Sequence, residues 1–124
     1  MSDIFEINAV EDISEEFLMM LLTQAAMGES ASKEAMLKAR AGDFELAKSL
    51  IKQAESAFNN VHKTQTSLIG FDAGEGKVPM TLILTHVQDH IMTGMLAKEI
   101  AEEIILVRQE LAELKKLIEV SRTV

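Results

Sequence analysis

The segment that decides the fold lies at residues 79–120 and reads PMTLILTHVQDHIMTGMLAKEIAEEIILVRQELAELKKLIEV. Pro79 can occupy the first turn of a helix, where its missing N–H costs nothing. Gly94 is the only later glycine in the segment and no proline follows, so one continuous helix can form. At 1.5 Å per residue this helix would be about 60 Å long. A compact chain of 124 residues has a radius of gyration of only about 14 Å, so the segment is too long for its own chain to cover.

A first helix is predicted over residues 14–41, before this long segment. Ser14 is a candidate N-cap, and the acidic side chains of Glu15 and Glu16 suit the positive end of a helix. Residues 28–32, GESAS, are weak helix formers, so we expect a kink or bend there.

A second helix is predicted over residues 44–69. Gly42 would end the first helix, and Asp43 would cap the second. Residues 70–77 contain three glycines and predict a loop. The periodicity of the second helix predicts a buried face made of Leu46, Leu50, Ala54, Ala57, Val61 and Leu68.

The composition supports an all-α fold, which we predict to be a three-helix antiparallel bundle with a long third helix. The chain has one proline and neither tryptophan nor tyrosine. We expect a flexible N-terminal leader at residues 1–13 and one domain at residues 14–124. The absence of cysteine excludes disulfides and thiolate metal sites. The sequence shows neither a signal peptide nor a membrane span, so we expect a cytoplasmic protein without direct membrane insertion. A formal net charge of −8 argues against nucleic acid as a partner.

The end of the third helix predicts a homo-oligomer. Steps of four and three residues from His86 trace a continuous seam that becomes apolar toward the C-terminus. Packing this seam against copies of itself is the simplest way to bury it. The seam consists of His86, His90, Thr93, Ala97, Ile100, Ile104, Val107, Leu111, Leu114 and Ile118.

Three ionisable side chains, His86, Asp89 and His90, share one face of the predicted third helix. On the buried side of a helix they are costly unless they are paired, bound to a metal or used chemically. The two histidines could ligate a metal with Asp89 as a third ligand. Gln88 could donate a hydrogen bond to a bound anion. His62 has no neighbouring carboxylate and is expected at a structural or surface position.

Four stretches of the sequence resemble one known family. They are THVQDHIMT at residues 85–93, ARAGDFELA at 39–47, HKTQTSLI at 62–69 and AEEII at 101–105. In this order, over about residues 14–108, they closely resemble the lactose/cellobiose-type enzyme IIA of the bacterial sugar phosphotransferase system.

This resemblance implies a homotrimer with the third helices around its axis, and a phosphocarrier function. His86 would accept a phosphoryl group from HPr as a phosphohistidine and pass it to enzyme IIB. The group would then reach a disaccharide entering through membrane enzyme IIC. Asp89 of three subunits would share a metal ion, Mg²⁺, and Gln88 and His90 would stabilise the phosphoryl group. The alternative is a non-catalytic helical oligomer with a structural metal at His86, Asp89 and His90.

Overall fold

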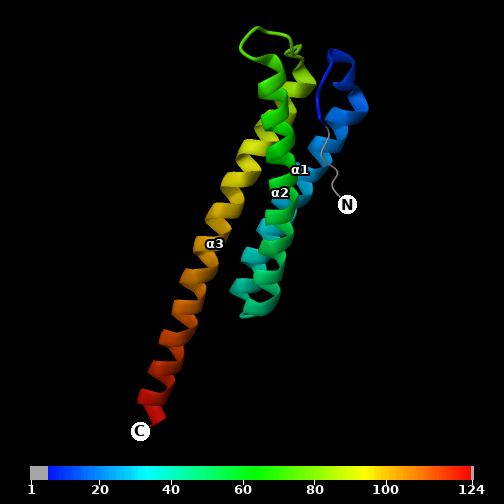
Figure 1. Cartoon of the computed structure of the whole chain (residues 1–124). Coiled ribbons are helices and arrows are strands. Elements are labelled where there is room, and N and C mark those ends of the chain that lie inside the picture. Colours follow the sequence, from blue (N-terminus) through cyan, green and yellow to red (C-terminus); the bar gives the residue numbers. More distant parts are fainter. Residues whose placement is uncertain (1–5, 124) are drawn as a thin grey trace.

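The computed structural model describes residues 6–123, which contain a short 3₁₀ helix η1 (Val10–Asp12) and three long helices. These are α1 (Glu15–Arg40), α2 (Phe44–Asp72) and α3 (Leu82–Thr123), and no strand occurs over this range. α1 and α3 run in one direction and α2 in the other (Figure 1). α1 packs against both other helices more extensively than they pack against each other. The predicted all-α three-helix bundle is confirmed.

The predicted turn between the first two helices is also confirmed. The hydroxyl of Ser14 accepts the N–H of Phe17 at 3.1 Å and caps α1. Asp43 caps α2 by accepting the N–H of Leu46 at 3.2 Å. Gly42 between them has a backbone φ of +88°, which residues other than glycine rarely adopt. α1 runs without interruption through residues 28–32, where a bend was expected.

Two predicted helix boundaries were wrong. α2 continues past Ile69 to Asp72 and ends where Ala73 adopts a left-handed conformation, with its N–H donated to the Ile69 carbonyl. α3 begins at Leu82 and not at Pro79, because the Thr81 hydroxyl accepts the N–H of Leu84 and caps the helix there.

The predicted leader can be followed from residue 6 onward. Ile7 is buried in the main core, and its N–H donates to the hydroxyl of Ser67 on α2 at 3.1 Å. This part of the leader therefore contacts the bundle. The division into residues 1–13 and 14–124 stays a prediction, and residues 1–5 lie outside the described residues.

The centre of the bundle is the ring of Phe58, which is 3% exposed. It fills the space between Gly28 of α1 and Gly94 of α3. A Cβ atom added at Gly28 would lie 2.6 Å from the ring, and one added at Gly94 would lie 2.8 Å from it. Both distances are far below van der Waals contact. The two glycines therefore allow all three helices to meet around one aromatic side chain.

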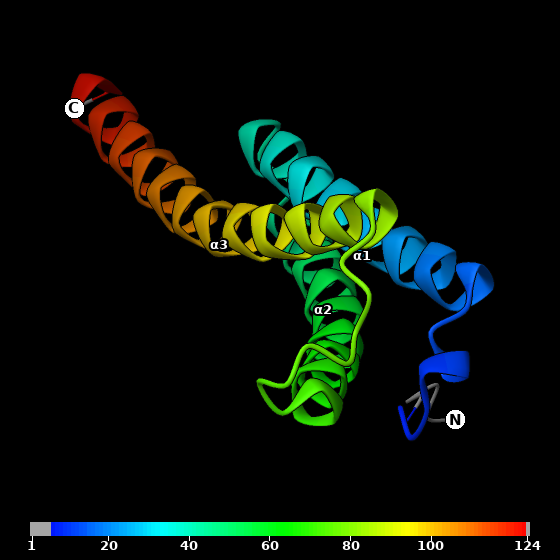
Figure 2. The same cartoon turned by 90° about the horizontal axis from the view of Figure 1, so that it is seen from above.

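The C-terminal part of α3 extends beyond α1 and α2 (Figures 1 and 2). At 1.5 Å per residue α3 is about 63 Å long, against about 39 Å for α1 and about 44 Å for α2. Apolar side chains on the extension stay exposed, including Val107 at 50% and Ile118 at 47%. The length mismatch that predicts an oligomer is therefore present.

Near the N-terminus of α3, the predicted seam does not follow the exposed surface of the helix. His90, Ala97 and Ile104 are half-buried, whereas Leu96 and Ile100 are exposed. A seam counted at 3.5 residues per turn drifts by about 20° per heptad on a straight helix with 3.6 residues per turn. We call the exposed stripe the outer face of α3, and it consists of Asp89, Thr93, Leu96, Ile100, Glu103, Val107, Leu111, Leu114 and Ile118.

No helix within residues 6–123 is both long enough and apolar enough to cross a membrane.

The packing around Phe58 predicts that Gly28→Ala destabilises the protein. Overpacking costs about 1–3 kcal/mol, and better helix propensity returns at most about 1 kcal/mol. We therefore expect the free energy of unfolding to fall by about 1–2 kcal/mol, measured by urea denaturation at fixed protein concentration.

Gly70→Ala is the matched control, because Gly70 is helical and a Cβ atom there meets nothing within 4 Å. It should leave the stability unchanged or raise it by up to about 1 kcal/mol. The Phe58→Leu background should reduce the penalty of Gly28→Ala. Equal effects of alanine at positions 28 and 70 would contradict the packing account.

Candidate functional site

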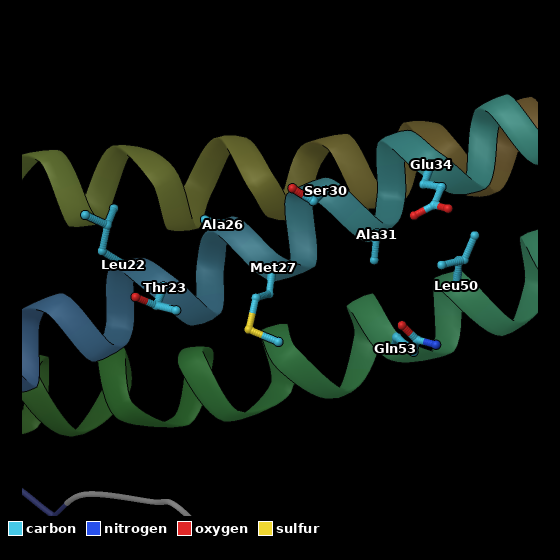
Figure 3. Close-up of a pocket in the computed structure, with 9 residues that line it drawn as sticks. All are labelled: Leu22, Thr23, Ala26, Met27, Ser30, Ala31, Glu34, Leu50 and Gln53. Atoms are coloured by element: carbon cyan, nitrogen blue, oxygen red, sulfur yellow. The ribbon is translucent and has the colours of Figure 1, made fainter.

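A groove of about 490 Å³ between α1 and α2 does not lie at the histidines. Figure 3 shows its lining residues, of which Glu34 is the only ionisable one. The others are apolar side chains, hydroxyls and one amide: Leu22, Thr23, Ala26, Met27, Ser30, Ala31, Leu50 and Gln53. The Thr23 hydroxyl donates to the carbonyl of Met19 and is not paired with Glu34. The candidate site residues predicted from the sequence lie elsewhere, near the start of α3.

The loop before α3 sets where this helix begins. The carboxylate of Asp72 accepts the N–H of Val78 at 2.9 Å and that of Gly76 at 3.3 Å. These backbone hydrogen bonds, the one from Val78 most of all, hold the pKa of Asp72 below its usual value. Val78 is buried in the core, and Thr81 then caps α3. The loop thus fixes the first turn of α3, one turn before His86.

His86 lies on the exposed surface of α3, contrary to the expectation that it faces the buried side. It borders a second hollow of about 490 Å³ together with Leu82 and Ile83. The imidazole is therefore accessible to a partner protein and has apolar side chains beside it.

His90 packs directly against His86. The two ring centroids are 4.6 Å apart and the ring planes meet at 83°, which is an edge-to-face arrangement. His90 is half-buried, and its Nδ1 lies 3.7 Å from Oε2 of Glu29 on α1. The predicted pairing of the two histidines is therefore present in the structure.

Glu29 links this pair to α1. Its Oε1 forms an ion pair with Nζ of Lys33 at 2.9 Å. The pKa of Glu29 is lowered, chiefly by the hydrogen bond from Lys33 and further by its interaction with His90. A carboxylate with a lowered pKa is ionised at neutral pH, so a fixed negative charge stands behind His90.

Gln88 does not share a face with His86, because residues two apart point to different sides of a helix. Its Oε1 accepts a hydrogen bond from Nε2 of Gln65 on α2 at 2.6 Å. Gln65 is buried, and Gln88 borders a hollow of about 330 Å³ under the glycine-rich loop. Within one chain the structure therefore brings His90 to His86 but places Gln88 toward α2.

Asp89 is exposed and stands at the N-terminal end of the outer face of α3. No group of three His, Cys, Asp or Glu side chains suited to a metal ion occurs among residues 6–123 of one chain. The alternative of a structural metal held by His86, Asp89 and His90 of one chain is therefore not supported.

Two residues at this site were missed in the sequence. Gln65 lies in the HKTQTSLI stretch that carries the family resemblance, and its polar side chain on a buried helix face was an available signal. Glu29 offered no such signal, because nothing local relates it to a histidine on another helix.

The family model described as "PTS system, Lactose/Cellobiose specific IIA subunit" matches residues 16–109. The match covers all of α2 and the site, and it ends within α3.

Curated relatives agree with this match. The chain is 42% identical over 97 residues to the N,N'-diacetylchitobiose-specific EIIA component of Escherichia coli strain K12, covering 78% of this chain and 84% of the relative. It is 34% identical over 99 residues to the lichenan-specific phosphotransferase enzyme IIA component of Bacillus subtilis strain 168, covering 80% of this chain and 90% of the relative.

Solved structures share the fold. The cellobiose-specific enzyme IIA of Bacillus anthracis superposes with a TM-score of 0.76 at 28% identity, covering 86% of this chain and 94% of that chain. The chitobiose IIA of Escherichia coli, solved in complex with HPr, gives a TM-score of 0.69 at 38% identity and covers 86% and 99%. The chain therefore belongs to the lactose/cellobiose-specific IIA family of the phosphotransferase system, whose members are phosphotransfer components of sugar transport.

Proposed function

We propose that this chain is the phosphocarrier of a disaccharide phosphotransferase system, and that His86 carries the phosphoryl group from phospho-HPr to enzyme IIB. The observation that carries the proposal is the exposed His86 imidazole, packed edge-to-face with a second histidine in a member of the IIA family. The related chitobiose IIA forms a complex with HPr, which supports HPr as the donor.

The protein has to supply little covalent chemistry for this reaction. A lone pair on an imidazole nitrogen of His86 attacks the phosphorus, and the bond from phosphorus to the donor breaks with its electron pair leaving on the donor. The other His86 nitrogen keeps its proton. In the second step a nucleophile of enzyme IIB attacks the phosphorus, and the electron pair of the N–P bond returns to His86. Positioning and stabilisation of charge are the tasks left to the surrounding residues.

His90 and Gln88 are the candidates for stabilising the phosphoryl group, which adds close to two negative charges. His90 is the better placed within one chain, since its ring touches that of His86. Gln88 stays a candidate because its bond with Gln65 uses its oxygen and not its amide nitrogen, which remains a possible donor.

The outer face of α3 supports a homotrimer. Its apolar side chains begin where α3 still packs against the bundle, with Leu96 55% exposed, and continue along the part of α3 that α1 and α2 do not reach. Packing three such faces together would bury them without any change in the bundle. Parallel packing around a threefold axis would also bring the three copies of Asp89 to the same level.

Three carboxylates at one level repel each other unless a cation lies between them. Oxygen ligands fit a hard divalent cation, so Asp89 of three subunits would hold Mg²⁺. Since one chain supplies a single such carboxylate, the site would exist only in the assembled form. The ion would neutralise the repulsion, and the roles proposed for His86, His90 and Gln88 in phosphoryl transfer do not involve it.

The family also suggests where this component works. Enzyme IIB and, through it, membrane enzyme IIC are the further partners, with the carrier itself in the cytoplasm. The chitobiose, lichenan, lactose and cellobiose relatives point to a disaccharide or a short glucan fragment as the sugar. The acidic charge of −8 remains an argument against nucleic acid as a partner.

His86→Ala should abolish labelling of the protein by phospho-HPr. The substitution removes the nucleophile at an exposed position, so the helix content seen by circular dichroism should not change. The measurement is the incorporation of labelled phosphate from phosphoenolpyruvate with enzyme I and HPr, followed by a test for an acid-labile phosphohistidine.

His62→Ala is the control, because His62 is exposed on α2 and should keep the label. The assignment is wrong if His62→Ala or His90→Ala loses the label while His86→Ala retains it.

The proposed assembly predicts a mass near three times 13.7 kDa in sedimentation equilibrium. Asp89→Leu should remove the bound metal yet keep or strengthen the trimer, because apolar packing replaces clustered charge. Asp89→Asn should also abolish metal binding with little change in helix content. A chelator should weaken the wild-type trimer but leave the Asp89→Leu trimer unaffected.

A different result would locate Asp89 away from the axis. That result is a wild type insensitive to the chelator together with an Asp89→Leu variant that dissociates to monomers.

A further inference from the structure

We propose that Glu29 is a positioning residue for phosphoryl transfer at His86, and that it acts through His90. The inference rests on the proposed function and deepens it. It assigns a task to the approach of His90 to Glu29, which links the histidine pair of α3 to α1.

The environment of His90 Nδ1 favours an interaction with Glu29. This nitrogen is buried, and among residues 6–123 it has no hydrogen-bond partner. Oε2 of Glu29 lies 3.7 Å away, which is about 1 Å longer than a charge-assisted hydrogen bond. A buried nitrogen without a partner is unfavourable, so a small rotation that brings the two atoms together is favoured. The carboxylate would then keep a proton on Nδ1.

Glu29 is itself held in place. Lys33, one turn later on α1, binds its other oxygen at 2.9 Å. The preceding residue, Gly28, lies against the Phe58 ring, and Gly94 touches the same ring one turn after His90. The contacts that fix α1 against α3 are therefore adjacent to both partners. A fixed carboxylate on a rigid helix can orient a ring more precisely than a mobile one.

An oriented His90 in turn orients His86. With Nδ1 turned toward Glu29, Nε2 is the nitrogen that remains for the His86 side, and in the imidazolium form of His90 its N–H can donate to the incoming phosphoryl group. The edge-to-face contact at 4.6 Å then restricts rotation of the His86 ring. A nucleophile that is already oriented loses less entropy when it reacts. Glu29 keeps its charge throughout, and no proton moves to it.

The alternative is that Glu29 only forms a surface ion pair with Lys33. Exposed pairs at i, i+4 contribute little, and the loss of such a pair would not alter the reaction at His86. The two accounts therefore differ in their kinetic consequence and in the state of His90.

The test compares Glu29→Gln with Glu34→Gln in single-turnover transfer from phospho-HPr. Glu34 is an exposed acid on the same helix that borders the α1–α2 groove instead of the histidines. For Glu29→Gln we expect the saturating rate to fall between about 10-fold and 100-fold. The phospho-HPr concentration at half-saturation should stay within about 2-fold of wild type, because the docking surface is intact. Glu29→Asp, which keeps the charge, should recover part of the rate, and Glu34→Gln should react like wild type.

Nitrogen-15 NMR of the imidazoles at one fixed pH gives the second readout. In wild type the His90 signals should show a proton on Nδ1, and in Glu29→Gln, whose amide can either accept or donate, this preference should weaken. A purely structural role would leave these signals unchanged while circular dichroism confirms folding.

The outcomes distinguish a failure of the proposed function from a failure of the role of Glu29 alone. If wild-type protein takes no label from phospho-HPr, or His86→Ala still does, the proposed function fails and this inference falls with it. If wild type is labelled at His86 but Glu29→Gln reacts at the wild-type rate, the inference alone is overturned. The inference is also overturned if Glu29→Gln changes only the phospho-HPr concentration at half-saturation, or if the His90 signals are unchanged in this variant.

Discussion

The approach of three helices around the ring of Phe58 is the constraint on which the rest of the structure depends. Gly28 and Gly94 each present bare backbone to this ring, so the ring can move toward neither helix without a clash. Large side chains on both sides would push α1 and α3 apart. The bundle thus obtains a close three-way contact from two residues that are poor helix formers. The helical cost of each glycine is offset by the packing that it permits.

The same contact places the site. Glu29 follows Gly28 directly, and His90 precedes Gly94 by one turn, so the distance between carboxylate and imidazole is set by how closely α1 and α3 approach. On the opposite side of α3, Gln88 meets Gln65 of α2. The segment around His86 therefore contacts both α1 and α2, while His86 itself remains accessible. The proposed carrier would meet two different partners, and it would need this combination of a rigid support and an open reactive group.

The sequence predicted the helices themselves better than the contacts between them. Ser14, Gly42 and Asp43 predicted both ends of α1 and the start of α2 correctly, because caps and left-handed turns are local and depend on a few neighbouring side chains. Pro79 predicted the wrong start for α3, because a proline permits a helix start without requiring one. The Thr81 hydroxyl provides the cap instead.

Relations between helices were harder to predict. The pairing of His86 with His90 follows from helical spacing, but the contact from Glu29 depends on how α1 lies against α3. Gly28 was interpreted as a weak point of the helix, whereas it is a packing position whose partner is 30 residues away in sequence. Such a partner is visible only once the bundle is assembled.

The spacing on the outer face of α3 has a consequence for how copies of this chain would wind together. Asp89, Ile100 and Leu111 lie 11 residues apart, as do Leu96, Val107 and Ile118. Eleven residues in three turns give about 3.67 residues per turn, slightly more than the 3.6 of a straight α-helix. Helices joined along such a stripe run almost straight or coil with a right-handed twist, the opposite hand to that of a heptad coiled coil. A bundle of α3 helices would then form a nearly straight stalk instead of a left-handed coiled coil.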